Sequence, residues 1–377
     1  MYIRRYMGTK RWALLAVGLL WGWSNVNLSA RSPGGNSLQK MISQYATFSD
    51  TTAKKIRSFF DYHERIGNFS GSYLMYKNDS LIYGANGYAI YGNRDSIEPN
   101  NLFQMASVSK VFTAISVMTL HQDGYLNIED SVHWYIPELN NKSLTIRQLL
   151  SHTSGLPDYF YVSYKGFELP EGQGHLKNED VIEIINKQSR RKYTRQGYYH
   201  YSNTNYVFLS LIVERLTKMD FRTYVKENIC KYADMRYTHI CDFDSLPLVN
   251  YPVQGYKNWR VYEDLMFNGT TGDKGVYSNV FEMFQLDRAL NGTYLLHDDT
   301  KEQMWTPQTL TKPTAYYALG WRVKWIDDQK WVFHNGWWKG FRTYFWRCLD
   351  EDKSFVVLTN NVQGPFLSTM EMVSLLK

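Results

Sequence analysis

Two kinds of apolar pattern lie side by side in the first third of the chain. Over residues 51–65 the apolar side chains, Ile56 and Phe60 among them, recur on one stripe of a helix. Residues 69–76 and 81–89 are instead rich in aromatic and branched side chains, and a short polar turn separates them. The pattern therefore predicts an amphipathic helix followed by a β-hairpin.

The middle of the chain, about residues 125–270, contains few alternating runs. Helical patterns predict a short helix over 178–187, with Asn178 as its cap, and a second helix that opens at 201–206 and ends near Thr217. Long loops join these segments. Such a stretch is typical of an all-helical lobe.

The last hundred residues return to strands. Four strand-like runs and a closing helix follow at 319–325, 331–335, 341–349, 354–360 and 370–377. Because an early hairpin and late strands flank the helical stretch, we predict an α/β (α+β) fold, with one antiparallel sheet flanked by helices and an all-helical lobe beside it. The α/β lobe would comprise about residues 50–124 and 271–377, and a cleft between the lobes would suit a small ligand.

Residues 1–30 have the composition of an export signal. Basic residues lie within the first eleven positions, an apolar core follows at 12–23, and a polar stretch ends in the small residue Ala30. The apolar core is short for a membrane span. We therefore predict a signal peptide rather than an uncleaved anchor, with residues 31–377 as a single domain that has no stable membrane span after signal removal. The location would be periplasmic or extracellular.

The net charge of +6 comes largely from this leader, because residues 1–30 carry four basic and no acidic side chains. The rest has the hydrophobic and charged content of a globular protein. It contains no Lys/Arg-rich run, so we predict no nucleic-acid partner. It also lacks His-x-x-x-His and Cys-x-x-Cys pairs, and we predict neither a metal nor another cofactor.

Three cysteines are present, and export would place them in an oxidising compartment. Cys230 and Cys241 are close in sequence, and the sequence leaves open whether they form a disulfide or remain two free buried thiols. Cys348 lies in a strand-like run, and we predict that it is a small core residue.

Residues 103–114 place a serine and a lysine three positions apart at a predicted helix start. Residues i and i+3 share one face of a helix, so Ser107 and Lys110 would be neighbours. The flanking residues are apolar, which favours a partly buried Lys110 with a shifted pKa. A serine beside an amine is one arrangement that activates a weak nucleophile, although Ser-x-x-Lys alone is most often solvated helix surface.

Two further motifs follow in order along the chain. Tyr201-Ser202-Asn203 comes about ninety residues later, and His334-Asn335-Gly336 lies on a predicted late strand. Each triplet taken alone is more often an ordinary turn, helix start or strand than a functional site. We interpret the remaining polar residues nearby as packing or loop residues, namely His152, His200, Asp273 and Lys274.

The joint order of the three motifs resembles the serine hydrolases of the class C β-lactamase and penicillin-binding-protein family, which includes D-alanyl-D-alanine carboxypeptidase-like enzymes. Motifs of that family are Ser-x-x-Lys, Tyr-x-Asn and Lys/His-x-Gly. Further similarities at 149–155, 272–276 and 319–321 extend the resemblance over about residues 69–361. The resemblance implies a β-lactamase/transpeptidase-like fold and an acyl-enzyme mechanism.

The resemblance also implies a role for each motif residue. Ser107 would attack the acyl carbon from a helix start, where unpaired backbone N–H groups favour developing negative charge. Tyr201 and Lys110 would move the proton, with nearby cations lowering the phenol pKa. Asn203 would orient Lys110 and the substrate amide.

The resemblance implies that residues in and next to the third motif contact the substrate. The backbone N–H of Trp337, carried over from the family, would complete an oxyanion hole with that of Ser107. Gly336 would let the substrate approach the strand closely. His334 stands where familiar β-lactamases have lysine, and a neutral imidazole is a weaker clamp for a substrate carboxylate.

We therefore predict an exported serine hydrolase that acts on a D-Ala-type peptide, a small ester or an amide, with peptidoglycan fragments as one candidate class. A β-lactamase is an alternative. A second alternative, of a different class, is a penicillin-binding or peptidoglycan-sensing protein with little turnover. That alternative would require that one of the three motifs lacks a residue of the family pattern, and all three motifs are complete.

Overall fold

A computed structural model of the chain describes residues 40–162, 167–240, 253–257, 260–262 and 265–377. Residues 42–377 form one compact unit, which holds every element described below, and residues 1–41 form a separate unit. The predicted signal peptide and the boundary at residues 30 and 31 lie outside the described residues and stay predictions. In the part of the chain that is described, no helix is both long and apolar enough to cross a membrane.

The longer elements follow the predicted order, with a hairpin first, a mainly helical stretch next and strands last. The α-helices are α2 (Asp50–Arg65), α3 (Ser109–Gln122), α4 (Ile146–Leu150), α5 (Tyr159–Val162), α6 (Asn178–Asn186), α7 (Thr204–Thr217), α8 (Phe221–Val225), α9 (Val280–Asn291), α10 (Asp298–Trp305) and α11 (Thr369–Ser374). A 3₁₀ turn, η1 (Ala106–Val108), precedes α3.

The strands of the main sheet are β1 (Gly71–Lys77), β2 (Ser80–Asn86), β10 (Thr309–Lys312), β11 (Ala315–Tyr317), β12 (Arg322–Ile326), β13 (Gln329–Trp338), β14 (Phe341–Cys348) and β15 (Lys353–Thr359). Short strands elsewhere are β3 (Tyr88–Ile90), β4 (Asp95–Ser96), β5 (Phe103–Gln104), β6 (His239–Ile240), β7 (Tyr256–Lys257), β8 (Arg260–Val261) and β9 (Val276–Ser278).

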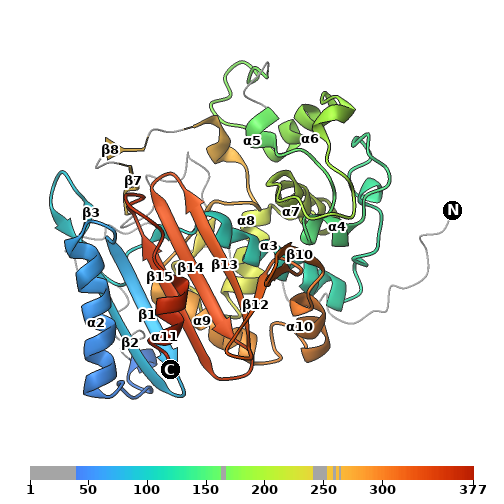
Figure 1. Cartoon of the computed structure of the whole chain (residues 1–377). Coiled ribbons are helices and arrows are strands. Elements are labelled where there is room, and N and C mark those ends of the chain that lie inside the picture. Colours follow the sequence, from blue (N-terminus) through green and yellow to red (C-terminus); the bar gives the residue numbers. More distant parts are fainter. Residues whose placement is uncertain (1–39, 163–166, 241–252, 258–259, 263–264) are drawn as a thin grey trace, which may run out of the picture. The chain divides into compact units, whose positions relative to one another are not determined.

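The main sheet runs in the order β10-β11-β12-β13-β14-β15-β1-β2, and all its neighbours are antiparallel. The predicted hairpin is β1 and β2, and β1 pairs on its other side with β15, so that Gly71 lies opposite Thr359. The N-terminal hairpin and the C-terminal strands therefore share one sheet, as predicted (Figure 1). The sequence pattern missed β10 and β11, because both are short and most of their residues are only partly buried.

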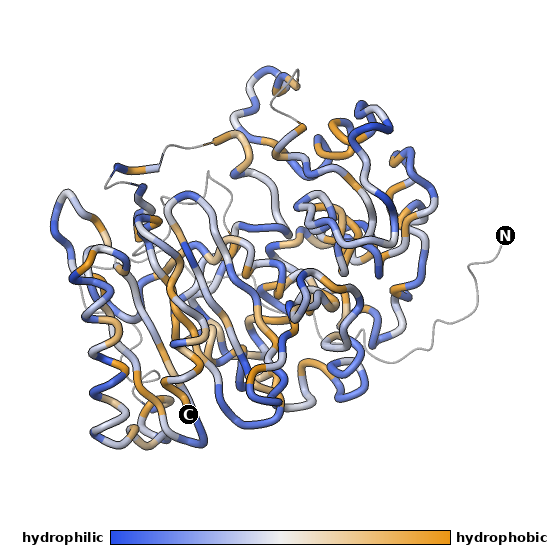
Figure 2. Tube along the Cα trace, in the orientation of Figure 1, coloured by the Kyte–Doolittle hydropathy of each residue, from blue (hydrophilic) through white to orange (hydrophobic). Residues whose placement is uncertain are grey.

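Helices cover both faces of this sheet. On one face, α2 and α11 pack against the strands; Phe60 of α2 stacks on Tyr73 of β1 with ring centroids 3.8 Å apart, and Met372 of α11 belongs to the same apolar cluster. In Figure 2, α2 alternates between hydrophobic and hydrophilic along its turns, as expected of an amphipathic helix. On the other face α9 packs against β1 and β15, and η1 packs against β13 and β14.

The helices of the middle segment pack on one another, with α7 in contact with α3, α4, α6 and α8. One detail of the prediction is wrong: Asn178 does not cap α6 from outside but is its first residue, and the backbone N–H of Lys177 donates to Asp180 Oδ2 at 2.7 Å. The buried Asn178 amide instead donates to Ser210 Oγ and Thr271 Oγ1, both at 2.9 Å. It joins α6 to α7 and to the loop before β9.

Two cysteines can be described. Cys230 and Cys348 are buried, and burial raises the pKa of each thiol. Cys241 lies outside the described residues. The possible Cys230–Cys241 pairing therefore lies outside what the structure describes, and both alternatives stay open.

Candidate active site

A small three-stranded sheet, in the order β5-β9-β6, positions the start of α3. Phe103 pairs with Ser278, and the backbone N–H of Met105 donates to Val276 O at 2.8 Å. The chain then turns sharply at Ala106, which is buried at φ +49°, a left-handed conformation that a residue with a Cβ adopts only under constraint. This turn presents Ser107 to a cavity, while the following helix is almost entirely buried.

Gly336 of β13 holds the sheet against this turn. A Cβ at Gly336 would lie 2.2 Å from Thr343 Oγ1 and 2.5 Å from Met105 O. Thr343 Oγ1 itself donates to Met105 O at 2.7 Å, so the three groups form one close contact. Gly336 therefore allows β13 to approach the backbone before Ser107, in addition to the closeness to substrate that we predicted.

We expect Gly336→Ala to lower the free energy of unfolding by about 1–3 kcal/mol, because an added methyl group overpacks this contact. Denaturant unfolding measures the change. Gly92→Ala is the matched control, since a Cβ at Gly92 meets nothing within 4 Å. A Gly336→Ala chain as stable as the Gly92→Ala chain would contradict the close packing.

Lys110 is fully buried and contacts three oxygens. Its Nζ lies 3.2 Å from Ser107 Oγ, 2.8 Å from Asn203 Oδ1 and 2.8 Å from the backbone oxygen of Asp273. Burial lowers its pKa to about 8, although the carboxylates of Asp273 and Asp158 act in the opposite direction. The oxygens of Asn203 and Asp273 can only accept hydrogen bonds. In its neutral form the Lys110 amine therefore donates both hydrogens to them and turns its lone pair toward Ser107.

Tyr201 lies on the other side of the serine, and its hydroxyl donates to Ser107 Oγ at 3.0 Å. Our expectation that cations lower the phenol pKa is wrong in its net result. Burial raises the pKa of Tyr201 well above its usual value, and the opposing effects of the Ser107 hydrogen bond and the Arg322 cation are smaller. In the resting site Tyr201 is therefore a protonated donor.

Asn203 links Lys110 to a buried carboxylate. Its side-chain oxygen accepts from Lys110, while its Nδ2 and backbone N–H both donate to Asp158 Oδ2, at 2.8 and 3.0 Å. The second oxygen of Asp158 accepts from the backbone of Phe160 at 3.0 Å. The predicted orientation of Lys110 by Asn203 fits this geometry, with Asp158 fixing which way the amide faces.

His334 is buried in β13 and does not line the cavity. Its Nδ1 donates to the backbone oxygen of Asn335 at 2.8 Å, and its Nε2 accepts from the Tyr317 hydroxyl at 3.1 Å. Burial and the cations of Arg322 and Lys110 hold its pKa well below the usual value, so the ring is neutral. The substrate-facing role predicted for His334 does not fit this geometry, because the protein occupies both ring nitrogens.

His152 supports Tyr201 from behind. Its ring lies 4.2 Å from that of Tyr201, and its Nδ1 accepts from the backbone N–H of Ser202 at 3.2 Å and from Asn205 Nδ2 at 3.0 Å. The interpretation of His152 as a packing residue that binds a loop fits these contacts. Asp273 and Lys274 likewise form a buried ion pair, with Nζ and Oδ2 at 3.3 Å.

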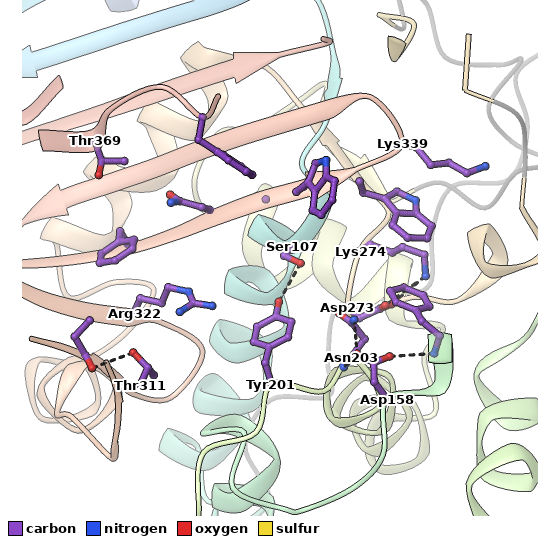
Figure 3. Close-up of a pocket in the computed structure, with 18 of the residues that line it drawn as sticks. Ser107, Asp158, Tyr201, Asn203, Asp273, Lys274, Thr311, Arg322, Lys339 and Thr369 are labelled. Carbon is purple, nitrogen blue, oxygen red and sulfur yellow. Dashed lines mark hydrogen bonds and ion pairs between the residues drawn. The ribbon is translucent and has the colours of Figure 1, made fainter. Parts of the chain in front are cut away.

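A cavity of about 910 Å³ lies at this site (Figure 3). Ser107, Tyr201 and Asn203 line it, and so do Gly336 and Trp337. Trp337 is 61% exposed. The predicted use of the Trp337 backbone N–H in an oxyanion hole stays a prediction. The cavity thus brings together residues that are up to about 230 positions apart in the sequence.

Arg322 of β12 lines the same cavity and was missed by sequence reasoning. Its guanidinium carbon lies 5.7 Å from the ring centre of Tyr201 and 5.5 Å from that of Tyr317. Figure 3 shows its side chain pointing toward the space in front of Tyr201. No signal in the strand pattern distinguished it, because Arg322 begins β12 and a second basic residue, Lys324, follows two positions later. Asp158 was also missed, since only the fold brings it to Asn203.

Comparison with known proteins finds relatives over most of the chain. A family model described as Beta-lactamase matches residues 59–372. Penicillin-binding protein 4* of Bacillus subtilis (strain 168) is 28% identical over 333 residues, which cover 81% of this chain and 71% of that protein. The crystal structure of a penicillin binding protein from Bacillus halodurans matches with a TM-score of 0.70 at 25% identity, covering 81% of this chain and 95% of that one. D-amino acid amidase from Ochrobactrum anthropi SV3, at 18% identity, shares the fold with a TM-score of 0.73, covering 87% and 97%.

Proposed function

The chain belongs to the β-lactamase family of serine hydrolases, and from this membership we propose that it is an exported hydrolase that cleaves D-Ala-type peptides with a free C-terminal carboxylate through an acyl-enzyme. The composition of residues 1–30 supports export. The observation that carries the choice of substrate is that Arg322 and Ser107 line the same cavity.

Arg322 supplies a positive charge in the cavity that no acidic residue neutralises. Among the described residues, no carboxylate lies within ion-pair distance of its guanidinium, and the groups that act most on its pKa are tyrosines. An arginine fork binds a carboxylate with two parallel hydrogen bonds. A substrate carboxylate held there would place the preceding amide near Ser107, which lines the same cavity.

Acylation needs one proton acceptor and one proton donor, and the site has both. Neutral Lys110 takes the Ser107 proton as Oγ forms a bond to the acyl carbon. Backbone N–H groups at the start of η1 stabilise the oxyanion. As the C–N bond breaks, Tyr201 gives its proton to the leaving nitrogen. Lys110 is then an ammonium and Tyr201 a phenolate.

Deacylation reverses both proton transfers. Water attacks the acyl carbon and gives its proton to the Tyr201 phenolate, while Ser107 Oγ leaves and takes a proton from Lys110. Both groups return to their starting states, so the cycle requires no external acid or base. The buried contacts of Lys110 with Asn203 and Asp273 hold its nitrogen in place throughout.

We expect Arg322→Gln to lower kcat/KM for N-acyl-D-Ala-D-Ala by about 10-fold to 100-fold, the effect of losing a hydrogen-bonded charge. The loss should be much smaller for the same peptide ending in D-alaninamide, which has no terminal carboxylate. The ratio of the two kcat/KM values in each variant is the measurement. Arg322→Lys, which keeps the charge without the fork, should fall between.

Equal losses on the acid and the amide would contradict carboxylate binding by Arg322. They would indicate instead that the guanidinium supports Tyr201, over whose ring it lies.

A second candidate substrate is a small aromatic ester or amide. Phe160 and Trp338 line the cavity on the side of Asp158 and stack with centroids 4.9 Å apart. This apolar wall suits an aromatic acyl group. Comparing benzoyl and acetyl esters tests it, and a preference for the benzoyl ester in kcat/KM would support this candidate.

A further inference from the structure

The cavity continues past Arg322 into a groove with a basic wall. Lys324 of β12 and Lys312 of β10 line this part together with Thr311 and Ala315. Resting on the proposed function, we propose that the groove binds the leaving group of the substrate, and that it selects leaving groups with a second negative charge beyond the one held by Arg322.

The register of the strands brings the three cations onto one face of the sheet. Arg322 and Lys324 are two residues apart in β12, so their side chains point to the same side, about 7 Å apart along the strand. Lys324 lies opposite Ala315, and Ala315 lies opposite Lys312. The two lysines thus flank a methyl group, which leaves room between them.

No acidic residue of the described chain pairs with the lysines of this wall. Lys324 Nζ contacts Met370 Sδ at 3.6 Å, and in the described parts of the chain no carboxylate lies within ion-pair distance of Lys324 or Lys312. Asp327, on the turn after β12, pairs with Lys377 at 2.7 Å.

The carboxylates inside the cavity belong to its other end. Asp273 pairs with Lys274 at 3.3 Å, and Asp158 accepts from Asn203. The wall formed by Arg322, Lys324 and Lys312 therefore carries an uncompensated positive charge.

Protection of a sheet edge accounts for only one of these lysines. Edge strands often carry lysine, and β10 is an edge of the main sheet. Lys324 lies on β12, which is paired on both sides by β11 and β13. Like charges close together on one face of a sheet are destabilising. A ligand that supplies the missing negative charge explains why the positions are basic.

Two aromatic side chains also line the cavity. Trp337 is 61% exposed and Phe366 is 51% exposed, with ring centroids 6.3 Å apart. The groove therefore suits an extended leaving group that has both anionic and apolar parts.

A pair of isosteric substrates isolates the second charge. N-acyl-D-Ala-D-Glu and N-acyl-D-Ala-D-Gln differ only in the charge of the side chain of the leaving residue. We expect the wild-type chain to prefer D-Glu in kcat/KM by about threefold to fivefold at low ionic strength, the range of a partly exposed ion pair. High salt and Lys324→Gln should each bring the ratio close to one. Lys55→Gln, on exposed α2, is the matched control and should keep the preference.

Binding of the same two peptides to Ser107→Ala, followed by the fluorescence of the tryptophans in the groove, separates this proposal from the proposed function. Tighter binding of D-Glu, lost in the double variant with Lys324→Gln, supports the second-anion groove even without turnover. Equal binding of D-Glu and D-Gln overturns it, whether or not Ser107 hydrolyses either peptide. A third arm with O-phospho-D-serine as the leaving residue, against D-serine, distinguishes a phosphate from a carboxylate as the preferred anion.

Discussion

Ser107→Ala is expected to lower kcat by at least about 10³-fold, because it removes the nucleophile of both half-reactions. The hydroxyl it removes lies 3.0 Å from the Tyr201 hydroxyl and 3.2 Å from Lys110 Nζ. Hydrolysis of N-acyl-D-Ala-D-Ala and of a small ester, measured with the same preparations, gives the loss.

Ser116→Ala is the matched control for this change. Ser116 is buried on the same helix, α3, and its hydroxyl donates to Phe112 O at 2.9 Å without reaching the cavity. It should retain most of the activity. A Ser107→Ala chain that keeps more than about a tenth of the wild-type kcat would exclude Ser107 as the nucleophile.

Lys110→Met is expected to lower kcat by about 10²-fold to 10⁴-fold, the usual contribution of a general base. Methionine keeps the length of the side chain but leaves Asn203 Oδ1 and the Asp273 carbonyl without their donor. Circular dichroism and thermal unfolding of the variant show whether it is folded at the assay temperature. A folded variant with nearly full activity would assign the base elsewhere.

The pH dependence follows from the pKa of Lys110, which burial lowers to about 8. Below that pH the amine is protonated and cannot accept the Ser107 proton, so the acylation rate should rise about tenfold per pH unit up to about pH 8 and then level off. Burial lowers the pKa of Lys274 to about 8 as well. The profile alone does not say which of the two lysines titrates. Because Lys110 is the proposed base, Lys274→Met should keep the profile and Lys110→Met should lose it.

Local sequence was sufficient for most strands of the main sheet and for the three motifs. The start of α3 was predictable because a serine, a lysine and an apolar period lie within one short segment. The hairpin of β1 and β2 was predictable for the same reason, since its turn lies between its two strands. The family resemblance supplied the long-range order that local patterns lack.

The remaining features depend on packing, which the sequence does not display. The direction of His334 depends on which face of β13 it occupies, and both faces are buried at that point, so a strand pattern alone does not predict its surroundings. The raised pKa of Tyr201 results from burial by distant segments, so the expected lowering by cations had the wrong sign. Arg322 and Asp158 lie outside the motifs and reach the site only through β12 and the turn before α5.

The mass of the chain during turnover tests the central role of Ser107 most directly. The chain is mixed with a slowly hydrolysed ester or a penicillin, quenched in acid, digested and analysed by mass spectrometry. We predict one acyl group per chain, on the peptide that contains Ser107, appearing and decaying at rates consistent with kcat. Hydrolysis by a chain that stays unmodified under these conditions, or an acyl group on a different residue, would contradict the acyl-enzyme mechanism at Ser107.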